Sequence, residues 1–251
     1  MHRLRRSIVL GTVALLAVGR AAGQARVYAL LSLVGNRIEI VDARPEIGSR
    51  LSQNRRRFFD DVEGTLDRLV AQAVAAAVSK EGRGAPLSML ALPGSALYDQ
   101  PERAFDGRQV VLPGSVVDAL EAGKFSHLLL VTKVRDAVRL PLYDSTAGVG
   151  AVQGIGFYVD PDLRLRIVET GHTGFGVLAP FVYVRISLVD VASGEVMRDE
   201  VLREVRTYAT AEKPDAVNPW EVLSAEQKLE ALRQLIQKSI GDAALRLLSG
   251  G

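Results

Sequence analysis

"PFVYVRISLVDVASGEVMRDEVLREVRTYA", residues 180–209, places two strand-like runs on either side of Ser193-Gly194. Both runs are rich in β-branched and aromatic residues, and a Ser-Gly pair suits a turn. The segment therefore predicts a long antiparallel hairpin.

Helices are predicted on both sides of this hairpin. Upstream, residues 114–122 form a short helical segment that ends at Gly123, and a buried strand follows from Phe125. This order of helix, glycine and strand is typical of α/β folds. Downstream, Ser224 and Gln227 form a capping box before a helix over residues 225–248. Its apolar stripe consists of Leu229, Leu232, Ile236, Ala243 and Leu247.

The first part of the chain predicts further strands and one more helix. Residues 27–34 and 37–41 are two apolar runs around Gly35-Asn36, which favours a tight hairpin. Residues 44–57 are polar and predict a loop, residues 59–80 predict an amphipathic helix, and residues 87–92 predict a short buried strand.

These elements predict one α/β (α+β) domain over residues 26–251. We expect a mixed, largely antiparallel sheet packed against the 59–80 and 225–248 helices, with the shorter 114–122 helix alongside.

Residues 1–25 have the layout of a cleaved secretory signal peptide. Three arginines lie among the first six residues, an apolar run of about eleven residues follows, and small residues close the segment. The run is shorter than the roughly 20 residues that span a bilayer as a helix. The expected location is the periplasm.

Composition excludes several classes of function. Four of the 31 basic residues lie before residue 26, which leaves 27 basic against 29 acidic residues and no general basic surface for nucleic acid. The chain has no cysteine, so thiol catalysis, disulfides and cysteine metal sites are excluded. We expect no metal and no cofactor.

The residues that could carry chemistry form no strong motif. "GVGAVQGIG", residues 148–156, is followed by strand-like residues, whereas a phosphate-binding turn opens a helix. His172 lies in a polar loop, with Asp160, Asp162 and Glu169 not far along the chain. A secreted hydrolase that uses His172 with one of these carboxylates is therefore an alternative hypothesis.

An apolar hairpin flanked by glycine-rich segments is the preferred candidate for binding. We predict a turn at Asp160-Pro161-Asp162 and a hairpin that projects from residues 145–180. Its apolar face would dock on another envelope protein or on a second copy of the chain, with membrane contact only at the periphery. The predicted contact residues are Ile155, Phe157, Val159, Leu163, Leu165 and Ile167.

Two segments resemble a group of periplasmic α/β domains. They are "GKFSHLLLVTKV", residues 123–134, and "VYVRISLVDVASGEVMRDE", residues 182–200. The group includes the curli secretion-channel subunit, the lipoprotein activators of penicillin-binding proteins and the amino-terminal domain of the Tol translocation protein. Gly123, Asp190, Ser193 and Gly194 occupy the positions that carry the likeness. Many relatives are lipoproteins, whereas this chain lacks the cysteine, and its first strands do not match the group's opening strand.

The resemblance implies a non-catalytic role in envelope assembly. Together with the weak catalytic motifs, it predicts a non-enzymatic periplasmic protein that acts by binding a partner.

Overall fold

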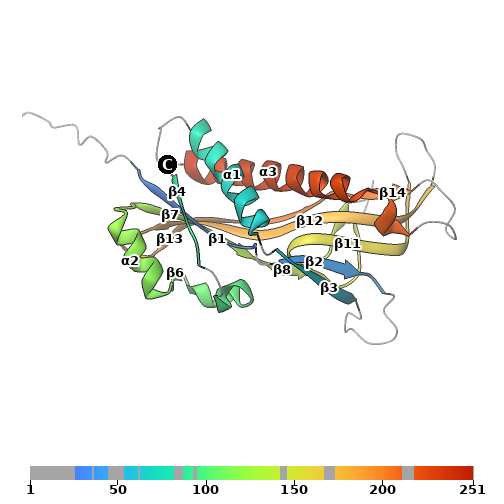
Figure 1. The fold of residues 1–251 in the computed structure, drawn as a ribbon, viewed down its shortest axis with the longest axis horizontal. Coiled ribbons are helices and arrows are strands. Elements are labelled where there is room, and N and C mark those ends of the chain that lie inside the picture. The colour runs from blue at the N-terminus through green and yellow to red at the C-terminus, as the bar shows by residue number, and fades with distance from the viewer. Residues whose placement is uncertain are drawn as a thin grey trace, which may run out of the picture.

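A mixed β-sheet forms the centre of the protein, with helices on both of its faces. The computed structural model describes residues 26–35, 37–44, 54–61, 63–81, 87–92, 95–141, 146–166, 173–210 and 218–250. Over these residues the helices are α1 (Thr65–Lys80), α2 (Gly114–Ala122) and α3 (Ala225–Ser249), and Figure 1 shows how they lie around the sheet. The predicted α+β fold class is confirmed.

Within the described residues the sheet has ten strands. Its main order is β3-β2-β11-β12-β7-β1-β4, and β13, β14 and β8 pair outside this path. The strands are β1 (Tyr28–Leu33), β2 (Arg37–Asp42), β3 (Arg55–Asp60), β4 (Leu87–Leu90), β7 (His127–Lys133), β8 (Arg135–Ala137), β11 (Ala151–Arg166), β12 (Thr173–Asp190), β13 (Val196–Val205) and β14 (Tyr208–Thr210).

Strand β12 organises the sheet because it pairs along both of its edges. One edge holds β11 and then β7, and the other holds β13 and then β14, all antiparallel. The predicted hairpin about Ser193-Gly194 is confirmed as β12–β13. Beyond β7, strands β1 and β4 continue in parallel register.

Helices α1 and α3 cover one face of the sheet. They bury a large apolar cluster that includes Leu30, Leu129, Val182 and Ile186 from the strands. In α3, Ser224 and Gln227 form the predicted capping box, in which Ser224 Oγ accepts a hydrogen bond from Gln227 N at 3.2 Å. The helix predicted over residues 225–248 is therefore confirmed.

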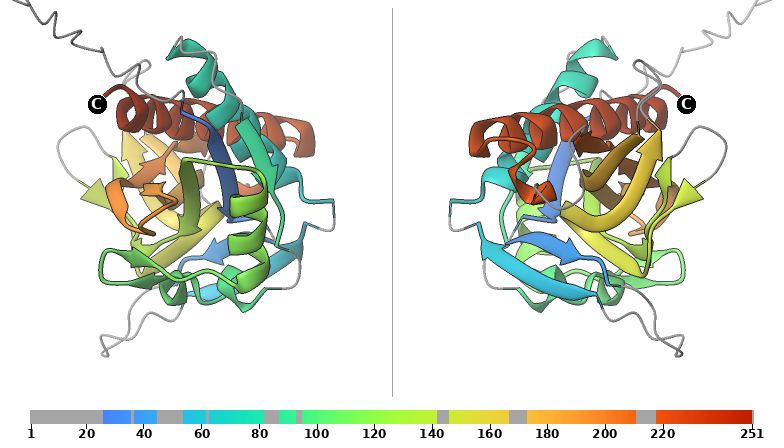
Figure 2. Two further views of the ribbon diagram at one scale, coloured as in Figure 1. Left: turned by 90° about the vertical axis from the view of Figure 1, so that its left-hand side faces the viewer. Right: turned by 90° about the vertical axis from the view of Figure 1, so that its right-hand side faces the viewer.

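The opposite face of the sheet carries α2 and two smaller apolar clusters. Val116 and Leu120 of α2 pack on Leu31 and Leu128, whereas Tyr158, Phe181 and Tyr183 belong to a separate cluster further along the sheet. The short helix thus lies across the sheet from α1 and α3, not alongside them as predicted, and the left view in Figure 2 shows α2 apart from the two long helices.

The predicted hairpin between residues 27–34 and 37–41 is wrong. β1 pairs with β7 and β4, whereas β2 pairs with β11 and β3.

The predicted loop over residues 44–57 is also wrong at its end, because residues 55–60 form edge strand β3 and the helix begins only at Thr65. Arg57 donates to both carboxylate oxygens of Asp42 on β2, at 2.9 and 3.0 Å, so neighbouring acidic residues offset the charge of the arginine run.

Over its described residues, 155–166, the predicted hairpin is part of a single strand. β11 runs from Ala151 to Arg166 between β2 and β12, and a register shift lies between Asp160 and Arg164 where a turn was expected. Asp160 accepts hydrogen bonds from the backbone nitrogens of Asp162 and Leu163, both at 3.0 Å, and these bonds stabilise an irregularity in the strand.

None of the described helices combines the length and the apolar character needed to cross a membrane.

Candidate functional site

The predicted contact residues on β11 are part of the core over the described stretch. Ile155, Phe157 and Val159 are 1%, 3% and 5% exposed and pack beneath α1 and α3. Leu163 is half-buried against the cluster around Tyr158. Three of the predicted contact residues are therefore unavailable to a partner in this fold. The side chain of Leu165 and all of Ile167 lie outside the described residues.

The predicted catalytic residues do not form a site in the described chain. Asp160 is 8% exposed, and its carboxylate is held by the local backbone and by Tyr158 OH at 3.4 Å, while burial raises its pKa. Asp162 is exposed on the same strand. Glu169 and His172 lie outside the described residues, and within those residues no three acidic or histidine side chains gather as metal ligands.

The outer edge of β13 is open over part of its length within the described residues, and it lies next to a groove. One edge of β13 pairs with β12 along its length. At the start of the outer edge, Val196 N donates to Arg108 O at 2.8 Å. From Arg198 to Val205, no strand within the described residues pairs with that outer edge. An unpaired edge presents backbone donors and acceptors that can pair with another chain.

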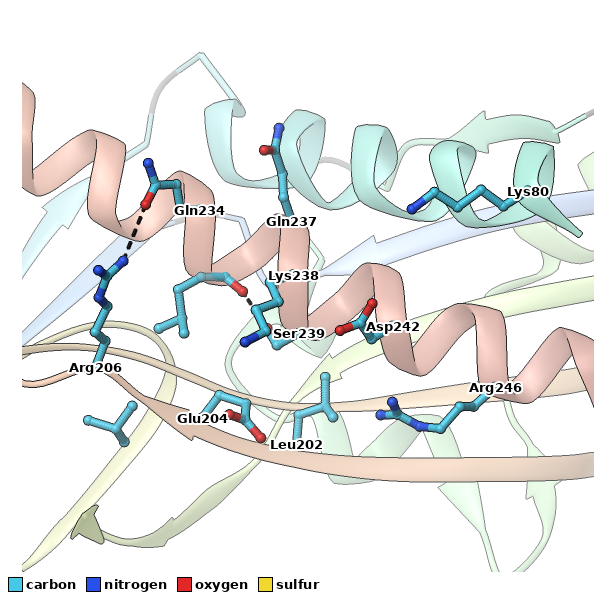
Figure 3. A pocket seen from close by; sticks show the side chains of 12 residues that line it. Lys80, Leu202, Glu204, Arg206, Gln234, Gln237, Lys238, Ser239, Asp242 and Arg246 are labelled. Atoms are coloured by element: carbon cyan, nitrogen blue, oxygen red, sulfur yellow. Dashed lines mark hydrogen bonds between the residues drawn. The ribbon is translucent and has the colours of Figure 1, made fainter. Parts of the chain in front are cut away.

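A groove of about 820 Å³ separates β13 from α3 (Figure 3). We call it the helix-side groove. Its residues from the strand side are Leu202, Glu204 and, at the end of β13 and just beyond it, Val205 and Arg206, and those from α3 include Lys238, Asp242 and Arg246. Figure 3 shows Leu202 and Glu204 on the strand side of the groove, with the Leu202 side chain directed towards α3.

Polar contacts set the shape of the helix-side groove. Arg206 Nη1 donates to Gln234 Oε1 at 3.2 Å near one end. Arg246 of α3 binds both carboxylate oxygens of Glu200 on β13, at 2.5 and 3.2 Å, near the other. Two side-chain bridges thus connect helix and strand.

A second groove, of about 300 Å³, lies on the opposite face of the sheet. We call it the opposite-face groove, and it reaches β13 at Val201 and Arg203. Because successive side chains of a strand point to opposite faces, β13 lines the helix-side groove through Leu202 and Glu204 and the opposite-face groove through Val201 and Arg203. The open edge therefore has a groove on each side.

Arginines fixed by neighbouring groups surround the opposite-face groove. The Arg185 guanidinium lies 5.2 Å from the centre of the Phe105 ring. Its Nε is 3.0 Å from Asp199 Oδ2, and this contact is an ion pair without hydrogen-bond geometry. Arg203 Nε donates to Asp136 Oδ2 at 2.5 Å. These contacts hold the charges in place before any ligand binds.

Lys133 lines the opposite-face groove and also a second, smaller cavity of about 50 Å³. Burial lowers the pKa of Lys133 to about 8.

Asp67 of α1 accepts hydrogen bonds from Ser32 Oγ at 2.5 Å and Tyr98 OH at 3.2 Å, and burial raises the pKa of this carboxyl. This network connects α1 to β1 and to the short turn at Tyr98, which is a structural role.

The open outer edge of β13 was not predicted, although the strand itself and the neighbouring helix α3 both were. The charged residues on both faces of residues 198–204 were the available signal, since a central strand would carry apolar residues there.

Comparisons with known proteins find only weak likenesses. No family model and no curated protein matches the chain. Among solved structures, a Xanthomonas campestris protein of family DUF330 aligns with 90% of this chain and 87% of its own, at 11% identity and a TM-score of 0.40. A neuraminyllactose-binding hemagglutinin homologue from Helicobacter pylori aligns over 90% and 81%, at 8% identity and a TM-score of 0.34. A PelC variant from Paraburkholderia phytofirmans, solved as a dodecamer, aligns over 88% and 91%, at 11% identity and a TM-score of 0.32. Scores this low carry no inference about function.

Proposed function

We propose that this chain is an exported, non-enzymatic protein of the cell envelope that binds a partner polypeptide along the open edge of β13. The observation that carries the proposal is the outer edge of Arg198–Val205, which no strand among the described residues pairs with and which has a groove on each of its faces. Strand addition to a sheet edge obtains affinity from backbone hydrogen bonds and specificity from pockets for alternate side chains.

The sequence supports the remaining parts of the proposal. The layout of residues 1–25 favours export. The predicted catalytic carboxylate of Asp160 is buried and is occupied by backbone hydrogen bonds within its own strand, which favours binding over catalysis.

Site-specific photo-crosslinking in the source organism, followed by hydrogen exchange, tests the proposal. A photoreactive residue at position 203 on β13 is compared with one at position 117 on α2, where Val117 is 40% exposed. We expect one partner to be captured from position 203 and not from position 117. The purified partner should then slow amide exchange over residues 198–205. Equal capture from both positions, or a bound partner that leaves these amides unprotected, contradicts strand addition at β13.

A further inference from the structure

We infer that the segment that adds along β13 is acidic and presents carboxylates on both of its faces, one set to the helix-side groove and the other to the opposite-face groove. This inference rests on the proposed function and specifies the chemistry of the partner.

Both grooves are basic within a chain that is acidic after residue 25. Each is lined by four basic residues, against two acidic residues in the helix-side groove and one in the opposite-face groove. The basic residues are Lys80, Arg206, Lys238 and Arg246 on the helix side and Lys133, Arg135, Arg185 and Arg203 on the opposite face. The chain after residue 25 has 27 basic and 29 acidic residues, so both grooves are more basic than the chain as a whole.

Basic groups still outnumber acidic groups in each groove when the ion-pair partners that lie outside its lining are included. Glu200 pairs with Arg246 on the helix side, and Asp199 and Asp136 pair with Arg185 and Arg203 on the opposite face. Counted over the described residues, each groove then has four basic and three acidic groups. A net positive charge on both faces favours a strand that carries negative charge on both faces.

Strand geometry explains why an extended peptide fits better than a compact anion. An added strand would lie about 4.8 Å beyond β13 and continue its alternation, so successive side chains would point to opposite grooves. The open stretch has eight residues, from Arg198 to Val205. A peptide of that length reaches both grooves at once, whereas a small anion occupies only one.

The test measures how three synthetic peptides bind to the purified protein, which is expressed with its own leader. The first, TEEVEEVT, places two glutamates on each face of an extended strand. The second, TKKVKKVT, reverses the charge. The third is the acidic peptide with N-methyl groups on four successive central amides, which removes donors on both of its edges. Binding is measured by calorimetry at low and at raised salt.

We expect the acidic peptide to bind and its affinity to fall as salt is raised, because exposed charges are screened. Removing one groove cation by Lys238→Gln or Arg203→Gln should weaken binding about two- to fivefold, with one variant reporting on each groove. Arg68→Gln removes an exposed charge from α1, where the side chain is 58% exposed, and should leave binding unchanged. N-methylation should cost more than any single variant, at least about tenfold, since several backbone hydrogen bonds are lost.

The outcomes separate the inference from the proposed function. Equal or tighter binding of the lysine peptide, or no binding of the acidic one, overturns the acidic partner but leaves strand addition to the hydrogen-exchange test. Equal binding of the N-methylated peptide means that a polyanion is held by charge alone, which overturns both. Protection of residues 198–205 that rises with protein concentration without peptide means that a second copy occupies the edge, and this also overturns the acidic partner.

Discussion

Strands β11 and β13 lie on opposite edges of β12, and the sequence patterns of the two strands predict different environments from those observed. β11 contains the apolar alternation expected of an exposed docking hairpin, yet Ile155, Phe157 and Val159 are at most 5% exposed. β13 has the sequence pattern of an ordinary hairpin strand, yet no strand of the described chain pairs with its outer edge over residues 198–205.

The residues on both faces of a strand, rather than alternation on one face, indicate whether the strand lies at the centre or at the edge of a sheet. Residues 155–159 of β11 include Ile155, Phe157 and Val159 on one face and Tyr158 on the other, and all four side chains are buried. A strand with apolar groups on both faces belongs at the centre of a sheet. β13 carries charged groups on both faces, which is typical of an edge.

Phe157→Ala on β11 should destabilise the protein more than any other substitution proposed for the two strands. Phe157 is 3% exposed and packs edge-on against Trp220 with ring centres 5.5 Å apart. The substitution removes a buried aromatic ring and leaves a cavity, so the free energy of unfolding should fall by about 3–5 kcal/mol. Urea denaturation measures the change.

Phe59→Ala on edge strand β3 is the matched control, since that ring is 53% exposed. It should cost less than about 1 kcal/mol. A cost for Phe157→Ala no greater than that of the control would mean that β11 is not a core strand in solution.

Gly156→Ala tests the same strand through its backbone. Gly156 lies opposite Glu39 of β2, and a Cβ atom there would collide with the Glu39 carbonyl oxygen. The two strands would have to separate, and we expect a loss of about 1–3 kcal/mol in the free energy of unfolding. Gly114→Ala at the start of α2 is the control, because a Cβ atom at Gly114 would have no other atom within 4 Å. Equal effects of the two substitutions in urea denaturation would contradict the β2–β11 pairing.

The fold could be predicted where local pattern determines it. The capping box of Ser224 and Gln227, the turn at Ser193-Gly194 and the buried run 127–133 are local signals, and each marks an observed element. The pairing of β1 with β7 could not be predicted in this way, because it joins residues about a hundred positions apart. The strand nature of β3 also depends on partners distant in sequence, since Asp42 offsets the charge of Arg57 across the strands.

The candidate site was less predictable than the fold. Residues 225–248 and the hairpin were both expected, but a groove between α3 and β13 exists only once helix and strand pack on the same sheet. The opposite-face groove combines Arg185 and Arg203 with Lys133 and Phe105 from other parts of the chain. No spacing in the sequence indicates that these side chains meet.

A pH series tests the buried charge beside β11. Glu39 accepts a hydrogen bond from Gln153 N of β11 at 2.8 Å, and burial raises its pKa despite the neighbouring Arg56. The folded chain therefore binds this proton more tightly than the unfolded chain. The associated stability is fully present below the unfolded pKa, near 4.5, and is lost as pH rises through the folded pKa.

Glu39→Gln removes this titration. From pH 4 to 7, the stability of the wild type relative to Glu39→Gln should fall, by at most about 1.4 kcal/mol per pH unit. Urea denaturation at four pH values measures it, with Glu63→Gln, whose parent side chain is 83% exposed, as the control. A relative stability that rises with pH would mean that the Arg56 ion pair outweighs burial.

The smallest effect is expected on β13 itself, for Val201→Ala. Val201 is half-buried at the open edge, so the loss of its methyl groups should lower the free energy of unfolding by less than about 1 kcal/mol. Val159→Ala on β11 is the matched control. Val159 is 5% exposed, so its substitution should cost at least about twice as much. Both variants are measured by urea denaturation at several protein concentrations. Equal costs would mean that Val201 is buried in solution. A cost of the Val201 substitution that also grows with protein concentration would mean that a second copy of the chain covers the edge, because only association makes this cost depend on concentration.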